Sequence, residues 1–256
     1  HVRSCGCLRV EQAHIMSQAK VLPSGEVAFN SLYAQYRAQA SVRHHVFELS
    51  TGDFRRITQQ VCRYCGCPPA QVKRSPGAIG GYVYNGIDRL DNLSGYTLKN
   101  SVASCWMCNS AKLEKGVGEF LAWVNLLVKP CEALPVKGVS MTSTYRILFR
   151  RYQNTAQRKR LIFALDERVF MSLIAAPCCY CGRPAHRRIS RSKPDVYTGI
   201  DRTNSAQGYT LENAVSCCWD CNSAKGQGTP ADLLAWAGRV VKWNMTASNT
   251  SEPNVS

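Results

Sequence analysis

Residues 62–66 read Cys-Arg-Tyr-Cys-Gly, and residues 105–109 read Cys-Trp-Met-Cys-Asn. Both motifs return further along the chain, as Cys-Cys-Tyr-Cys-Gly at 178–182 and Cys-Trp-Asp-Cys-Asn at 218–222. Two residues between two cysteines let a tight turn present both sulfurs to one tetrahedral ion, and the following glycine relieves that turn. Each half of the chain therefore predicts one structural Zn²⁺ site. The expected ligands are Cys62, Cys65, Cys105, Cys108, Cys178, Cys181, Cys218 and Cys221.

The cysteine pairs lie inside a longer internal repeat. Residues 33–66 align with 149–182 without a gap at an offset of 116, and the offset then becomes 113. At the second offset, Gly-Ile-Asp-Arg at 86–89 matches 199–202, and Gly-Tyr-Thr-Leu at 95–98 matches 208–211. We infer two tandem copies of one module. The predicted segments are an N-terminal extension (1–25), a first module (26–131), a linker (132–141), a second module (142–243) and a polar tail (244–256).

Composition favours a polyanionic partner. The 256 residues include 32 Lys and Arg against 17 Asp and Glu, a formal charge of +15, and two four-thiolate zinc sites lower this by about 4. No apolar run approaches the roughly 20 residues of a membrane-spanning helix, so we expect no membrane partner. Nucleic acid is the expected partner, and no small-molecule substrate is indicated. The first residue is His1 rather than Met, so either the chain was trimmed or a leader was removed, and a removed leader would suit a mitochondrial or other organellar matrix.

The cysteines also allow a disulfide framework. Recurrence of both pairs in a chain too large to need disulfides favours thiolates in an intracellular reducing compartment. The other cysteines are expected to be mostly buried or free thiols, with Cys5, Cys7 and Cys67 as an alternative third metal site. These remaining residues are Cys5, Cys7, Cys67, Cys131, Cys179 and Cys217.

Local patterns predict an α+β fold. Aromatic residues three or four apart predict helices over 32–42 and 145–158, and the residues from Ser50 resemble a cap before a short helix. Residues 83–89 read as a strand, 92–95 as a turn and 96–98 as the returning strand. Further helices are expected near each second cysteine pair and at Pro230, where Thr229 is the expected cap. The tryptophans that recur in the repeat are expected in the core, and these are Trp106, Trp123, Trp219 and Trp236.

Taken together, the motifs resemble a known family. Cys-x-x-Cys-Gly, Gly-Ile-Asp-Arg, Gly-Tyr-Thr-Leu-x-Asn and Cys-x-x-Cys-Asn-x-x-Lys are similar to the zinc-stabilised HNH (His-Me finger) endonucleases of phages, large viruses and homing elements. The resemblance covers nearly all of both modules. It implies a treble clef, in which a knuckle, a β-hairpin and a helix grip one zinc ion and carry the nuclease ββα element.

The resemblance also implies a catalytic site that is incomplete here. In the family an acidic residue and a His follow each other at the end of the first strand. The acid and a residue after the last cysteine pair hold a divalent ion, and the His activates water. The acid is Asp88 or Asp201, and the residue after the cysteines is Asn109 or Asn222. The His position holds Arg89 or Arg202, and arginine stays protonated, so it cannot accept a proton from water.

A substitute base exists in one module alone. Some relatives place the His three residues after the acid, where this chain has Asp91 in the first module and Asn204 in the second. An aspartate is a poor base, and an asparagine is none. Asn100 and Asn213 match an asparagine that braces the loop in the family. Either Asp88, Arg89, Asp91 and Asn109 form a nuclease site with Mg²⁺, or they are vestigial and brace the loops.

Two main functions follow, and a structural part of a virus or other large assembly is a third possibility. The preferred one is a non-catalytic, zinc-stabilised nucleic-acid-binding protein, with RNA favoured over DNA, such as a component of an organellar ribosome or another large ribonucleoprotein. The alternative is a metal-dependent HNH-type endonuclease with an active first module and a degenerate second module. Both use phosphate contacts from basic side chains, which give affinity without reading sequence. The expected contacts are Lys73, Arg74, Arg89, Arg150, Arg151, Arg187, Arg188, Arg191, Lys193 and Arg202, and further basic residues on the leading helix of the second module are Arg146, Arg158, Lys159 and Arg160.

Overall fold

The computed structural model describes residues 23–77, 79–129, 142–189 and 195–249. It divides into two compact units, the first made of residues 1–63 and 67–106, and the second of residues 64–66 and 107–256. The module boundaries inferred from the repeat stay a prediction. Most of the predicted extension and the linker lie outside the described residues, as do Cys5, Cys7, Cys131, Arg191 and Lys193.

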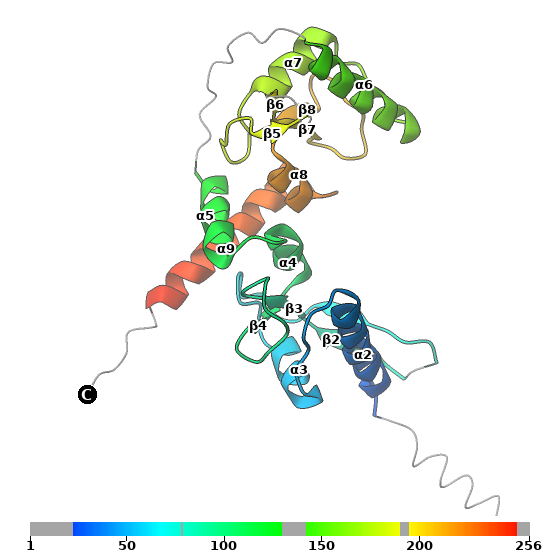
Figure 1. The fold of residues 1–256 in the computed structure, drawn as a ribbon, viewed down its shortest axis with the longest axis vertical. Helices are drawn as coiled ribbons and strands as arrows, with labels where there is room; N and C mark the ends of the chain where they lie inside the picture. The colour runs from blue at the N-terminus through cyan, green and yellow to red at the C-terminus, as the bar shows by residue number, and fades with distance from the viewer. Residues whose placement is uncertain (1–22, 78, 130–141, 190–194, 250–256) are drawn as a thin grey trace, which may run out of the picture. The chain divides into compact units, whose positions relative to one another are not determined.

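The described part of the first unit contains two helices and two hairpins (Figure 1). The helices pack beside the sheets, and each sheet is a two-stranded antiparallel pair. In the second hairpin, Gly86 pairs with Ser104 and Asp88 with Val102. The elements are α2 (Glu26–Val42), α3 (Thr51–Thr58), β1 (Gln71–Lys73), β2 (Tyr82–Tyr84), β3 (Gly86–Arg89) and β4 (Ser101–Ser104).

A helix cap, a buried aromatic ring and a hydrogen bond fix the positions of these elements. The side chain of Ser50 caps α3 by accepting a hydrogen bond from the backbone N–H of Asp53, as the sequence predicts. Phe54 of α3 is fully buried in the core of this unit. The hydroxyl of Tyr36 on α2 accepts a hydrogen bond from the Ile87 N–H at 3.1 Å, which ties the leading helix to β3.

The second unit repeats this order of elements. The helices α6 and α7 pack with the hairpins β5–β6 and β7–β8, and Asp201 pairs with Val215 in the second hairpin. The Tyr152 hydroxyl accepts from the Ile200 N–H at 3.0 Å, at the position that Tyr36 has in the first unit. The elements are α4 (Trp106–Lys112), α5 (Val117–Leu127), α6 (Ser143–Arg158), α7 (Glu167–Ala175), β5 (Arg187–Arg188), β6 (Val196–Tyr197), β7 (Gly199–Arg202), β8 (Ala214–Cys217), α8 (Trp219–Lys225) and α9 (Pro230–Asn249).

A separate core joins α5 and α9, which lie side by side (Figure 1). The rings of Phe120 and Trp123 on α5 lie 6.2 and 6.0 Å from the ring of Trp236 on α9. Helix α9 begins at Pro230, and the Thr229 hydroxyl accepts from the Asp232 N–H, so the predicted cap is confirmed. The helix continues to Asn249, so the beginning of the predicted polar tail is helical.

Three expectations from the sequence are wrong. The strand expected at 83–89 is divided at Asn85 into β2 and β3, which belong to different sheets. The returning strand is residues 101–104 rather than 96–98, because Tyr96 instead forms an isolated bridge with Phe47. Trp106 and Trp219 are 65% and 49% exposed, whereas the other two repeated tryptophans are buried. Within the described part of the chain, no helix is both long and apolar enough to span a membrane.

Candidate metal centres and polar pocket

Four cysteines of the second unit form a compact group of sulfurs. The Sγ atoms of Cys178, Cys181, Cys218 and Cys221 all lie within 4.8 Å of one another, and all four residues are buried. The Sγ atoms of Cys181 and Cys218 are 3.7 Å apart. Four sulfurs at about 2.3 Å from one tetrahedral zinc ion lie roughly 3.8 Å apart, so the group fits zinc. The predicted ligands of the second module are thus brought together.

Backbone geometry presents these sulfurs. The Gly182 N–H donates to the Cys178 carbonyl at 2.8 Å, which closes the first turn, and Gly182 has a φ of +69°. Cys218 is the N-cap of α8, and Cys221 lies in the first turn of that helix. Hydrogen bonds among the sulfurs, led by the one with Cys181, hold the pKa of Cys178 far below its usual range. Bonds with Cys178 and Cys181 raise the pKa of Cys218 and of Cys221, so the four sulfurs share their charge as one coupled group, and a zinc ion would be needed to hold all four as thiolates.

Arg183 places a positive charge against this group. Its Nε lies 3.5 Å from the Cys181 Sγ, and its Nη2 lies 3.6 Å from the Cys218 Sγ. The same guanidinium pairs with Asp220 at 2.5 Å, and Lys115 pairs with the other oxygen of Asp220 at 2.8 Å. Burial acts to lower the pKa of Arg183, but its bonds with Cys181 and Asp220 outweigh burial and raise it. A four-thiolate zinc site carries a net charge of about −2, which this guanidinium partly offsets.

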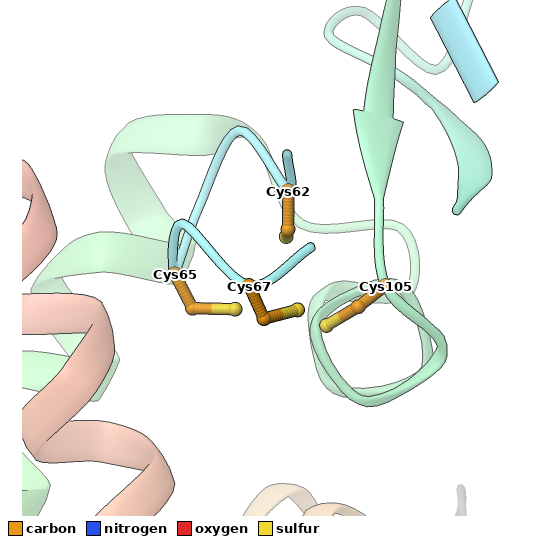
Figure 2. Close-up of side chains that lie close together, drawn as sticks. All are labelled: Cys62, Cys65, Cys67 and Cys105. Carbon is orange, nitrogen blue, oxygen red and sulfur yellow. The ribbon is translucent and has the colours of Figure 1, made fainter. Parts of the chain in front are cut away.

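A second group of sulfurs involves the first cysteine pair. Figure 2 shows the side chains of Cys62, Cys65, Cys67 and Cys105 converging, and their Sγ atoms lie within 4.8 Å of one another. The Cys62 N–H donates to the Cys67 carbonyl at 2.8 Å, so the knuckle turn itself brings Cys67 inward. This set also offers four sulfurs to a zinc ion.

Cys67 was expected outside the paired ligands. Its place in the repeat is that of Arg183, so the first group has a thiol where the second has a guanidinium. Cys108, the fourth ligand expected from the sequence, is buried and accepts a hydrogen bond from the Trp236 Nε1 at 3.3 Å. Its role as a ligand stays a prediction. None of the cysteines in the described residues forms a disulfide.

The acid at the end of β7 already has a cationic partner. The Lys225 Nζ lies 3.4 Å from the Asp201 Oδ1, and its side chain is 0% exposed. The Tyr180 hydroxyl donates to the Asp201 Oδ2 at 2.7 Å. Burial raises the pKa of Asp201, and Tyr180 and Lys225 oppose that rise. A divalent ion at this carboxylate would have to displace a buried ammonium group.

Arg202 holds the loop that follows β7. The Arg202 Nη1 donates to the carbonyls of Ser205 and Gln207 at 2.7 and 2.6 Å. Its guanidinium also lies 5.3 Å from the centre of the Tyr209 ring. Arg89 does the same in the first unit, with the carbonyls of Asn92 and Ser94 each at 2.9 Å. Both arginines therefore brace loops.

Asp91 and Asn100 belong to the same loop-bracing network. Asp91 accepts hydrogen bonds from the Ser94 hydroxyl at 2.7 Å and the Leu93 N–H at 2.9 Å. The hydrogen bond from Ser94, followed by that from Leu93, lowers the pKa of Asp91, which makes it a weaker base. The Asn100 side chain bonds the backbone of Asp91 and of Gly95, which confirms its expected bracing role.

A polar pocket of about 310 Å³ lies beside Asp201. It combines cationic, amide and aromatic groups from β7 and α8, from the loop after β7 and from Lys159, the C-cap residue of α6. Asn109 on α4 has the position in the repeat that Asn222 of this pocket has, and it is partly buried. The lining includes Lys159, Asp201, Arg202, Trp219, Asn222 and Gln227.

The other predicted nucleic-acid contacts are dispersed. In the first unit the Lys73 Nζ donates to the Gln35 Oε1 at 2.9 Å, and Arg74 is exposed. In the second unit Arg150 and Arg151 are exposed on α6, and Arg187 and Arg188 are exposed on β5. The sequence did not single out Arg183 or Trp219 as functional residues. A signal existed for Arg183, since it follows the glycine of the knuckle as Cys67 does.

Comparison with known proteins shows what this chain is similar to. No family model matches the chain. "Uncharacterized protein R423" of Acanthamoeba polyphaga mimivirus is 31% identical over 196 residues, which cover 75% of this chain and 33% of that protein. The chain therefore spans about a third of that relative. A solved structure of the rare-cutting HNH restriction endonuclease PacI matches with a TM-score of 0.32 and 17% identity, over 44% of this chain and 88% of PacI.

Proposed function

We propose that this chain is a zinc-stabilised nucleic-acid-binding protein that does not cleave its ligand. In this proposal, tandem treble-clef modules each use a four-sulfur zinc site to hold a knuckle, a hairpin and a helix together. The two cysteine groups support the zinc sites. The charge of +15 supports a polyanionic ligand, because basic side chains gain affinity from phosphates.

The ion pair between Asp201 and Lys225 is the observation that supports the absence of cleavage. In the resembling family the equivalent acid holds a divalent ion, whereas here a buried ammonium lies 3.4 Å from that carboxylate. A like charge in a poorly solvated site opposes binding of a second cation. The position of the general base holds Arg202, a residue type that cannot serve as a base, and its Nη1 donates to two backbone carbonyls.

The alternative nuclease centre in the first module depends on Asp91 as base. Hydrogen bonds lower the pKa of that carboxyl, which is the wrong direction for a group that must accept a proton near neutral pH. No observation favours this alternative over nucleic-acid binding. The organellar ribosome expected from the sequence finds no support in the comparisons, so we propose neither that assembly nor a preference for RNA.

The test is an assay for binding and cleavage on the same sample. Zinc-loaded protein is incubated with supercoiled plasmid and with labelled RNA in Mg²⁺ or Mn²⁺, and the products are run on native and denaturing gels. We expect shifted bands that disappear as salt rises, with intact nucleic acid. Cleavage that Asp88→Ala or Asp201→Ala abolishes would contradict the proposal. Cleavage that survives both substitutions identifies a contaminant, and absence of any shift would refute binding.

A further inference from the structure

One helix of the second unit presents a cationic face. Helix α6 (Ser143–Arg158) contains no Asp or Glu, and its exposed side includes four arginines. At 100° per residue these arginines fall within about 140° of the helix circumference, and they span roughly 18 Å of its axis. Lys159 and Arg160 follow the helix and are also exposed. The four arginines are Arg146, Arg150, Arg151 and Arg158.

No acidic group compensates this face in the part of the chain that the structure describes. The ion pairs there involve other residues, and Arg158 donates only to the Thr155 hydroxyl, at 3.4 Å. The opposite side of α6 packs into the core through residues such as Leu148 and Phe149. The charge is therefore confined to the solvent side.

The fold does not require these charges. The matching positions of α2 in the first module hold uncharged residues, although α2 has the same place in its unit and the same tyrosine contact to the following strand. Four arginines on one helix and none at the matching positions of its repeat indicate a role in binding. The matching residues of α2 are Asn30, Ala34, Gln35 and Val42.

The cationic face leads to the polar pocket. Lys159, the C-cap residue of α6, lines the pocket that also contains Arg202 and Trp219. Trp219 is 49% exposed at the first residue of α8. A track of positive charge that ends at an exposed aromatic ring is the combination that binds single-stranded nucleic acid, because the ring stacks on an unpaired base.

We propose that the second module binds single-stranded nucleic acid, with the α6 arginines against the phosphate backbone and Trp219 stacked on one base. This inference rests on the proposed nucleic-acid binding and adds its location and the strandedness of the ligand. The two contacts differ in their response to salt, since phosphate contacts release counterions and stacking does not.

The experiment measures the affinity of the full-length zinc-loaded protein for a labelled 20-nucleotide single strand between 50 and 300 mM salt. A plot of log affinity against log salt has a negative slope. Changing the four arginines to Gln should make this slope less steep by about 3, since each phosphate contact contributes about 0.7. A control that changes four exposed cations elsewhere removes the same charge and should alter the slope much less. The control residues are Arg37, Arg43, Lys99 and Lys129.

The stacking of Trp219 on a base is tested with substitutions that leave the net charge of the protein unchanged. Trp219→Ala should weaken binding roughly 5- to 100-fold with an unchanged salt slope, and Trp219→Phe should recover most of the affinity. Trp106→Ala is the matched control, because Trp106 has the same repeat position and is 65% exposed. Zinc content and thermal unfolding identify variants that fail to fold. For the helix, replacing the four arginines with Lys retains the charge and should restore the slope.

Four outcomes decide the inference. Wild-type protein that binds no nucleic acid refutes both the proposed function and this inference. Binding with equal slopes for the α6 and control variants refutes only the location. A 20-base-pair duplex bound as tightly as the single strand refutes the strandedness. Binding to phosphatidylserine vesicles that depends on α6, while nucleic-acid binding does not, would assign this face to membranes instead.

Discussion

The ammonium group of Lys225 pairs with the Asp201 carboxylate, which a divalent ion would otherwise bind. Its ammonium donates to the Gly228 carbonyl at 2.9 Å and lies 3.3 Å from the Ser205 hydroxyl, besides pairing with Asp201. Each of these contacts is intramolecular, so the lysine serves the fold. At the residue scale, these contacts give Lys225 a structural role in the second unit.

Lys225→Met should destabilise the protein by about 3–5 kcal/mol, because it leaves the buried Asp201 carboxylate without its charge partner. Urea unfolding followed by circular dichroism measures the change. Lys242→Met is the control, since Lys242 is exposed. The double variant with Asp201→Asn should lose less stability than the sum of the two single variants. Additive losses would mean that the two residues are not coupled.

The zinc ligands should respond differently in the two modules. The first module has Cys67 near its ligands, whereas Arg183 has that place in the second module. We predict that Cys67→Ser and Cys108→Ser each retain zinc in the first site, and that the double variant loses it. In the second site, the single substitution Cys221→Ser should be enough to lose zinc. Zinc per chain is measured by native mass spectrometry, and loss of one ion from Cys108→Ser alone would show that Cys67 cannot substitute.

At the scale of elements, helix α9 contacts residues 64–66 of the first knuckle turn, which belong to the second unit. The Asn244 Nδ2 donates to the Tyr64 carbonyl at 2.8 Å, and the Tyr64 ring lies 5.3 Å from Phe120 of α5. Gly66 has a φ of +69°, and a Cβ atom there would overlap the Trp243 ring. The close approach of helix and turn therefore requires glycine at this position.

Gly66→Ala should be more destabilising than Gly77→Ala. Both residues have positive φ, of +69° and +71°, so both substitutions cost about 1–2 kcal/mol of backbone strain. Gly77 has open space around its Cβ position, whereas Gly66 faces Trp243. The overlap should add about 1–3 kcal/mol. Thermal or urea unfolding of the two variants tests this, and equal losses would show that α9 does not press on the turn.

Elements with local signals were predictable from the sequence. The cap at Ser50 and the start of α9 after Thr229 depend on residues three apart, so they appear in the pattern itself. The returning strand was placed wrongly because its position depends on contacts that are distant in sequence. Tyr96 bridges to Phe47 and Asn100 closes the loop, and neither contact leaves a periodic signal.

For the whole molecule, the sequence predicted the sulfur groups better than it predicted what surrounds them. C-x-x-C pairs are local and specific, so the second group matches the expected ligands in full. Exposure of a tryptophan depends on tertiary packing instead. Trp219 and Trp236 both follow the repeat, yet one is exposed beside a pocket and the other is buried against α5.

Zinc per chain is the most direct test of the whole proposal, since both cysteine groups are held to be metal sites. Protein purified without added metal is analysed by inductively coupled plasma mass spectrometry, and its thiols are mapped by alkylation and peptide mass spectrometry. We predict two zinc ions per chain and no disulfide among Cys178, Cys181, Cys218 and Cys221. Protein without zinc, or with these sulfurs oxidised to one another, would contradict the prediction.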